Sequence, residues 1–156
     1  MILRVDDRYV HGQVIAGWVR PLGINYLILA NNEIAGDDWA KNTYNLAVPE
    51  NIKFTVTELD NLMNVIDPKI NKTMILVGSI KDAVKLIEDG LNVKEVDLGC
   101  LSFDDGKCEV CSYIYLSKED IEYIKILNQK GIKVLARALP NCPTTDVGKF
   151  IKEMKD

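Results

Sequence analysis

The sequence of 156 residues has a single histidine, no excess of basic residues and no long hydrophobic run. Lys and Arg number 19 against 23 Asp and Glu, which gives a formal net charge of −4. Because nucleic-acid-binding proteins usually carry a basic face, this balance argues against a nucleic-acid partner. The longest apolar stretches, such as residues 26–30, fall far below the roughly 20 residues that span a bilayer. The sequence therefore predicts no transmembrane segment.

The N-terminus also lacks the basic region and the long apolar core of a signal peptide, so we expect a cytoplasmic protein. Its four cysteines, Cys100, Cys108, Cys111 and Cys142, are then expected to be reduced thiols. Cys108 and Cys111 have the spacing of a metal or redox motif, with the other two as candidate further ligands. In an extended strand, however, these two side chains point to opposite faces and cannot chelate one ion. We expect no metal site here.

Hydrophobic residues make up 47% of the chain, enough for a sizeable core, and we expect one domain over residues 1–156. Short apolar runs without strict alternation are typical of strands in a sheet that is covered on both faces. Such runs predict strands at residues 2–5, 26–30, 54–56, 74–77, 96–98 and 133–136.

Amphipathic stretches with helix start and stop signals lie between these strands. They predict helices over residues 14–19, from 37 or 38 to before Pro49, 80–87, from the Ser117 cap to before Gly131, and 146–154. The alternation favours a three-layer α/β/α fold on a mostly parallel open sheet of about six or seven strands. Residues 104–107 predict a turn, and 112–116 an additional strand whose place in the sheet is left open.

The connection after the first strand carries the most chemistry. It reads Asp6-Asp7-Arg8-Tyr9-Val10-His11-Gly12-Gln13-Val14 and holds two carboxylates, a guanidinium and an imidazole. Ligands of open α/β sheets usually bind at the carboxyl ends of strands, where this loop lies. The N–H groups of the following helix start, and the helix dipole, favour an anion there. The same positive end favours the neutral form of His11, which can attack phosphorus.

Arg8 offers a fork of donors that matches phosphoryl oxygens. Asp6, or as second choice Asp7, could orient Arg8 or the second ring nitrogen of His11. Because phosphoryl transfer needs mainly positioning and charge stabilisation, this loop requires no metal or other cofactor. The residue types alone also fit plainer interpretations, namely a structural histidine and a surface ion pair of little energetic value.

Two other function classes fit less well. A receiver-type phospho-switch would match Asp6-Asp7, but it also needs an aspartate after the third strand and a lysine after the fifth. Those positions read Thr57-Glu58 and Leu98-Gly99. No glycine-rich dinucleotide or phosphate-binding motif follows any predicted strand, which argues against a nucleotide-binding module.

The loop string, followed by Trp18, closely resembles the Asp-Asp-Arg-x-x-His-Gly-Gln-Val segment of one family. This family is the IIB components of the bacterial phosphoenolpyruvate-dependent sugar phosphotransferase system, in the mannose/fructose/sorbose class. The resemblance covers essentially the whole chain. Further matching segments are Leu76-Val77-Gly78-Ser79-Ile80-Lys81-Asp82, Asp97-Leu98-Gly99, Phe103-x-Asp105-Gly106-Lys107, Leu139-Pro140 and the tail from Asp146.

The resemblance implies a three-layer α/β/α fold and a set of site roles. His11 matches the phospho-accepting histidine and Arg8 the arginine that holds the phosphoryl oxygens, with Asp6 beside them. The remaining matched positions are Gly12, Gln13 and Ser79, which would bind phosphate, and Asp7 and Gly99, which would support the site. The chain departs from the commoner family pattern at Gly78-Ser79, at Cys100 and at Tyr9.

The resemblance also implies an activity, that of a protein-N(π)-phosphohistidine–sugar phosphotransferase. Such a protein takes a phosphoryl group from a IIA partner and passes it to a sugar held by the membrane IIC/IID permease. It would lie in the cytoplasm and reach the inner face of the membrane through the permease. The sugar pocket belongs to the permease, so the resemblance specifies neither the sugar nor whether copies of the chain associate. A regulatory paralogue that accepts phosphate without feeding a permease is the alternative.

Overall fold

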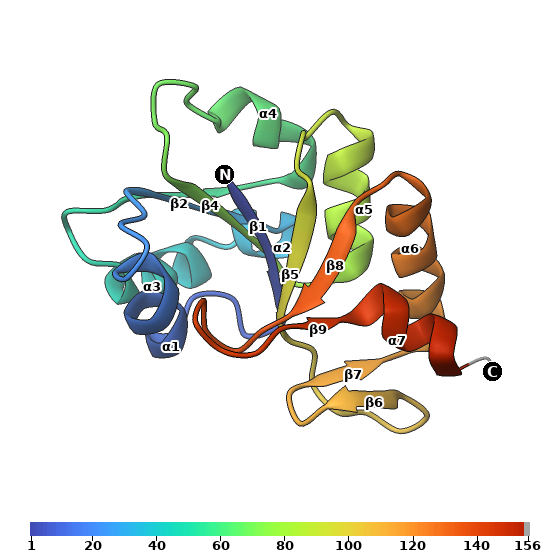
Figure 1. Ribbon diagram of the computed structural model, residues 1–156. Coiled ribbons are helices and arrows are strands. Elements are labelled where there is room, and N and C mark those ends of the chain that lie inside the picture. Colours follow the sequence, from blue (N-terminus) through green and yellow to red (C-terminus); the bar gives the residue numbers. More distant parts are fainter. Residues whose placement is uncertain (155–156) are drawn as a thin grey trace.

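A computed structural model describes residues 1–154. One sheet of seven strands runs through the molecule in the order β3-β2-β4-β1-β5-β8-β9 (Figure 1). All neighbouring strands are parallel except β8 and β9, which are antiparallel. The strands are β1 (Ile2–Asp6), β2 (Tyr26–Ala30), β3 (Lys53–Thr57), β4 (Thr73–Val77), β5 (Glu95–Cys100), β8 (Lys133–Ala136) and β9 (Thr145–Asp146). The six strands predicted from the apolar runs are all present.

Helices cover both faces of this sheet, which confirms the three-layer α/β/α arrangement. They are α1 (Gly12–Val14) with its π-helical continuation Ile15–Val19, α2 (Asn32–Ala35), α3 (Asp38–Ala47), the 3-10 turn Leu59–Asn61, α4 (Leu62–Val65), α5 (Ile80–Glu88), α6 (Lys118–Gln129) and α7 (Val147–Met154). Within residues 1–154, no helix is long and apolar enough to cross a membrane.

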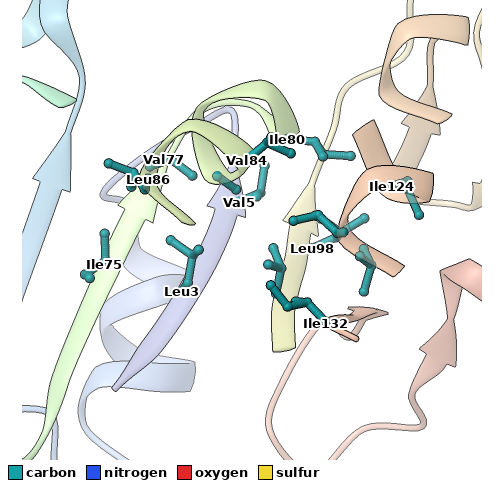
Figure 2. Packing of buried hydrophobic residues seen from close by; sticks show 14 of the residues in the cluster. Leu3, Val5, Ile75, Val77, Ile80, Val84, Leu86, Leu98, Ile124 and Ile132 are labelled. Carbon is teal, nitrogen blue, oxygen red and sulfur yellow. The ribbon is translucent and has the colours of Figure 1, made fainter. Parts of the chain in front are cut away.

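The two faces of the sheet form two separate cores. Leu3 and Val5 of β1 face α5 in the core that α6 and α7 also cover, and Figure 2 shows them beneath Ile80 and Val84 of α5. Residues at the alternate positions of the neighbouring strands point to the opposite face of the sheet. There they pack against α1 and its continuation, which includes Trp18. This alternation is the period-two geometry of a strand buried on both sides.

Local sequence signals explain where the helices begin. The Ser117 hydroxyl accepts the N–H of Asp120 at 3.0 Å, and the Asp120 carboxylate accepts the N–H of Ser117 at 2.8 Å. This reciprocal capping box confirms the start predicted for α6. Asp37 caps α3 by a single bond, since its Oδ1 accepts the N–H of Ala40 at 3.1 Å. The last helix begins one residue later than predicted, since Asp146 belongs to β9.

The strand predicted at residues 112–116 lies outside the main sheet. β7 (Ile114–Leu116) pairs with β6 (Cys108–Cys111) as a separate antiparallel hairpin below the ends of the central strands (Figure 1). A bridge between Leu101 and Ile114 attaches the hairpin to the segment that leaves β5. Pairing between distant segments decides this placement, so the local pattern could not supply it.

The hairpin also corrects the argument about the cysteine pair. A register shift between Glu109 and Cys111 leaves Cys108 opposite Leu116 and Cys111 opposite Ile114. Leu116 and Ile114 are buried on the same face of β7, so the bulge brings both cysteines to one side. Simple alternation was therefore the wrong reason to separate them. Among the described residues, no third cysteine, histidine or carboxylate joins this pair at metal-ligand distances.

Candidate functional site

The loop between β1 and α1 makes a tight turn directly after the buried end of β1. The N–H of Tyr9 donates to the carbonyl of Asp6 at 3.0 Å, and Tyr9 has a φ of 58°. This left-handed conformation costs a residue with a side chain roughly 1 kcal/mol, and such strain persists where surrounding contacts fix it. Here the Tyr9 hydroxyl accepts a hydrogen bond from Asn31 Nδ2 at 3.0 Å and packs against Gly78. A Cβ at residue 78 would overlap the Tyr9 ring.

Asp6 is the centre of the site. Its side chain is fully buried and accepts four hydrogen bonds. Oδ1 accepts from the backbone N and from Nε of Arg8, at 3.0 and 3.1 Å. Oδ2 accepts from Nη2 of Arg8 at 3.1 Å and from Nε2 of His11 at 2.9 Å. One carboxylate therefore fixes both the guanidinium and the imidazole.

The bond to Asp6 determines which nitrogen of His11 is free. Because a carboxylate oxygen only accepts hydrogen bonds, Nε2 of His11 carries the proton in this arrangement. In the neutral ring the lone pair then lies on Nδ1. The His11 side chain is 20% exposed, so the ring is held from the inside and reached from the outside.

The start of α1 leaves backbone donors next to the ring. His11 is the N-cap residue with extended backbone, and no side chain of the described residues caps this helix start. The N–H groups of Gly12, Gln13 and Val14 have no acceptor within the helix, as at any helix start. A Cβ at Gly12 would meet nothing within 4 Å, so the space beside the ring is open. The arrangement suits a phosphoryl oxygen placed near His11.

Electrostatics keep Arg8 charged. The hydrogen bond to Asp6 raises the pKa of Arg8 above its usual value, although burial acts in the opposite direction. The side chain is 43% exposed, and the pair with Asp6 uses Nε and Nη2. Nη1 therefore remains for an anion that approaches from solvent.

Asp7 has a different partner from Asp6. Its Oδ2 accepts the N–H of Ser102 at 2.7 Å, and its own N–H donates to the carbonyl of Cys100 at 3.1 Å. Burial, followed by the charge of Asp7, raises the pKa of the Cys100 thiol. Asp7 thus ties the loop after β5 to the His11 loop, while orienting Arg8 falls to Asp6.

The other predicted site residues contact the reactive loop less directly. The Ser79 hydroxyl accepts the N–H of Asp82 at 3.1 Å and so caps α5. A Cβ at Gly99 would overlap the guanidinium of Arg4, so this glycine makes room for a buried arginine. Gln13 is exposed on the first turn of α1. No contact described within residues 1–154 joins Ser79, Gln13 or Gly99 to the His11 ring.

Within residues 1–154, one group of side chains has ligand atoms close enough for a metal ion. Oxygen atoms of Asp6 and Asp7 and the sulfur of Cys100 all lie within 4.8 Å of one another. Asp6, however, already accepts four hydrogen bonds from Arg8 and His11. The guanidinium and imidazole donors thus already engage both oxygens of Asp6.

The model of the PTS system sorbose subfamily IIB component matches residues 1–156. The chain belongs to this family. It is 25% identical over 157 residues to the fructose-specific EIIB component of Bacillus subtilis, covering 99% of this chain and 96% of that protein. The sorbose-specific EIIB component of Lacticaseibacillus casei is 26% identical, with 98% and 95% covered. The mannose-specific EIIAB component of Escherichia coli is 28% identical over 98% of the chain, which spans only 48% of that relative.

Solved structures support the same fold for this IIB component. The IIB domain of the sorbose permease from Klebsiella pneumoniae superposes with a TM-score of 0.87 at 23% identity, covering 97% of this chain and 95% of that one. An N-acetylgalactosamine IIB component from Streptococcus pyogenes gives 0.89 at 23% identity, with 96% of both chains covered. The architecture is therefore retained at low sequence identity.

Sequence reasoning missed Arg4, a fully buried arginine on β1 with Trp18 packed over it. The signal was present, because a charged residue interrupts an otherwise apolar strand that is expected to be buried on both faces. It also missed Asn31, since the bond to Tyr9 depends on how the loop after β2 folds.

Proposed function

We propose that this IIB component carries a phosphoryl group on Nδ1 of His11. The supporting observation is the hydrogen bond from His11 Nε2 to the buried Asp6 carboxylate, which leaves Nδ1 as the nucleophile. In the first step the Nδ1 lone pair attacks the phosphorus of a phosphohistidine on a IIA protein. The N–P bond of the donor breaks, and its electron pair returns to the donor imidazole.

Arg8 and the N–H groups at the start of α1 would bind the phosphoryl oxygens during this step. Phosphoryl transfer passes through a transition state with charge spread over these oxygens, so fixed donors stabilise it. Asp6 would hold the Nε2 proton and balance the positive charge that develops on the ring. In the second step a sugar hydroxyl attacks the phosphorus, and the electron pair of the Nδ1–P bond returns to His11.

The partners in this proposal are a IIA phosphocarrier and a membrane IIC/IID permease that holds the sugar. The name of the E. coli EIIAB relative joins the letters A and B in one protein, which supports a IIA partner for a separate IIB chain. The protein would then act in the cytoplasm, at the inner face of the membrane. The relatives carry the names of several sugars, so none is assigned here.

The test is a phosphotransfer assay with the general phosphocarriers and candidate IIA proteins. We expect the unmodified chain to gain one phosphoryl group that is labile in acid and stable in base. His11→Ala should gain none while keeping its circular dichroism spectrum. Label that persists in this variant would remove His11 from the role of acceptor.

A further inference from the structure

Phe103 is an exposed aromatic residue on the segment that leaves β5, and the proposed transfer chemistry does not use it. The residue is 67% exposed. Its ring lies edge-on to that of Tyr115 in β7, with the two ring centroids 5.5 Å apart and the ring planes at 87°. A single exposed apolar residue is common on protein surfaces and by itself indicates no function. Phe103 differs in how its segment is held and in where that segment lies.

Hydrogen bonds fix the backbone that leads to this exposed ring. The carbonyl of Leu101 accepts the N–H of Tyr115 at 3.0 Å. The N–H of Ser102 donates to Oδ2 of Asp7 at 2.7 Å, and the carbonyl of Ser102 accepts from Nζ of Lys107 at 3.0 Å. The next side chain along the segment is therefore presented to solvent from a fixed backbone.

The segment lies beside the reactive histidine. Cys100 is the register partner of Asp6 on the neighbouring strand, and Asp6 accepts the hydrogen bond from His11 at 2.9 Å. Neighbouring strands are roughly 4.8 Å apart, and Ser102 follows only two residues after Cys100. A protein–protein interface of standard size covers about 800 Å² on each partner, which corresponds to a disc of about 16 Å radius. A protein that reaches His11 therefore covers Phe103 as well.

We infer that Phe103 is a recognition residue for the phospho-IIA donor and that Asp7 is the positioning residue that holds its segment. This inference rests on the proposed function. Aromatic side chains are enriched among the residues that contribute most to protein–protein affinity. A side chain on a fixed backbone also loses less conformational entropy when a partner binds. Phe103 would insert into an apolar depression of the donor beside its phosphohistidine, while Arg8 meets the phosphoryl group.

The donor fits this surface better than the other candidate partners do. A second copy of the chain on Phe103 would cover His11 and block transfer. A permease approaches His11 with the sugar between the two proteins. In transfer from the donor, only the phosphoryl group separates two imidazole rings, so the donor is the partner whose surface must come closest.

The experiment compares two phosphoryl donors in Phe103→Ala. Phospho-IIA needs a protein interface, whereas phosphoramidate does not: its P–N bond breaks, ammonia leaves, and the phosphoryl group passes to Nδ1 of His11. We expect the KM for phospho-IIA to rise about tenfold or more, as for the loss of an aromatic anchor. The rate with phosphoramidate should stay within about twofold of the unmodified chain. Phe103→Trp, which keeps an aromatic ring, should keep the KM for phospho-IIA within about threefold.

Met63→Ala is the control, because Met63 is also an exposed apolar residue but lies on α4, at the opposite end of the molecule from the β6–β7 hairpin (Figure 1). Its KM for phospho-IIA should not change. An unchanged KM in Phe103→Ala would overturn the inference, as would an equal slowing with phosphoramidate. Normal uptake from phospho-IIA together with slower transfer to the sugar would assign Phe103 to the permease and would also contradict it.

The role of Asp7 is tested by combining substitutions. We expect Asp7→Ala to raise the KM for phospho-IIA, and to raise it by less than about twofold further when Phe103→Ala is already present. Asp7→Asn keeps a side-chain oxygen that can accept the N–H of Ser102, so its KM should stay within about threefold. Fully additive effects of Asp7→Ala and Phe103→Ala would show that Asp7 does not act through Phe103. Failure of the proposed function is distinguishable, because then the unmodified chain gains no label on His11 from either donor.

Discussion

The two faces of the central sheet differ in what they bury. Under α5, α6 and α7 the sheet contributes apolar side chains, such as Leu3, Val5 and Leu98. The opposite face buries the three charged residues Arg4, Asp6 and Asp97, of which Asp6 is fully enclosed. Strand β1 supplies both faces from alternating positions. One face therefore provides most of the purely apolar packing, and the other carries Asp6, the carboxylate that holds Arg8 and His11.

This comparison explains why the site needs so few residues from its own loop. A loop is usually more mobile than the strands that it connects. Here, though, Asp6 belongs to β1 and holds Arg8 and His11 from inside the sheet. Rigidity thus comes from the strand, and access comes from the loop.

We call the face of the sheet that buries Arg4, Asp6 and Asp97 the charged face. The largest effect is expected there, from Asp6→Asn. The amide cannot accept from every donor that Asp6 satisfies, and its N–H₂ group can force the opposite tautomer on His11. We expect phosphorylation by phosphoramidate to slow by about a thousandfold, in the range of losing a preorganised electrostatic contact. The control is Asp105→Asn, an exposed carboxylate in the turn before β6, which should react like the unmodified chain. If the phosphorylation rate of Asp6→Asn falls by less than about threefold, the reactive histidine does not depend on this face of the sheet.

The apolar face is tested by Ile124→Ala, which removes a fully buried side chain of α6. Truncations of this kind cost about 2–5 kcal/mol through lost burial and a residual cavity. We expect the free energy of unfolding in urea to fall by about 3 kcal/mol. Phosphorylation of the folded fraction should stay within twofold. A large loss of rate in fully folded protein would show that the apolar face also controls the site.

Arg8→Lys sharpens the comparison within the charged face. Lysine keeps the charge, but it cannot form the two-point pair that Arg8 Nε and Nη2 make with Asp6. We expect a folded protein with a transfer rate about tenfold lower, and little change in the affinity for a IIA donor. Steady-state kinetics that vary the concentration of phospho-IIA separate these quantities. An unchanged rate would mean that the geometry of the fork is dispensable.

Most of the parallel sheet could be predicted from the sequence, because its strands are continuous apolar runs between helix signals. The separate roles of Asp6 and Asp7 could not be predicted from the sequence. Both lie at the end of β1, and only the three-dimensional structure places one against Arg8 and the other against Ser102. The place of the strand predicted at residues 112–116 stayed open for a similar reason, since the bulge and the pairing of the β6–β7 hairpin arise from contacts between segments.

The sequence pattern also did not predict that the apolar side chains of α3 are exposed. The start of this helix at Asp37 and its end before Pro49 were predicted, but Trp39 is 77% exposed and Leu46 87% exposed. Apolar residues at helical spacing usually mark a buried face, and here they do not. Tyr44 is the one residue of this helix that packs onto the apolar core around Trp18. Its ring lies edge-on to that of Tyr9, with the two ring centroids 6.1 Å apart.

The smallest effect is expected from Tyr9→Phe, which removes one hydroxyl from the boundary between the loop and this core. The variant loses the bond from Asn31 Nδ2 but keeps the ring contacts with Gly78 and Tyr44. A single hydrogen bond of this type contributes about 1 kcal/mol, so the free energy of unfolding should fall by about that amount. Because Tyr9 holds the loop two residues away from His11, we also expect phosphorylation by phosphoramidate to slow by no more than threefold. A loss comparable to that of Arg8→Lys would mean that the strained turn at Tyr9, and not Asp6 alone, sets the position of the imidazole.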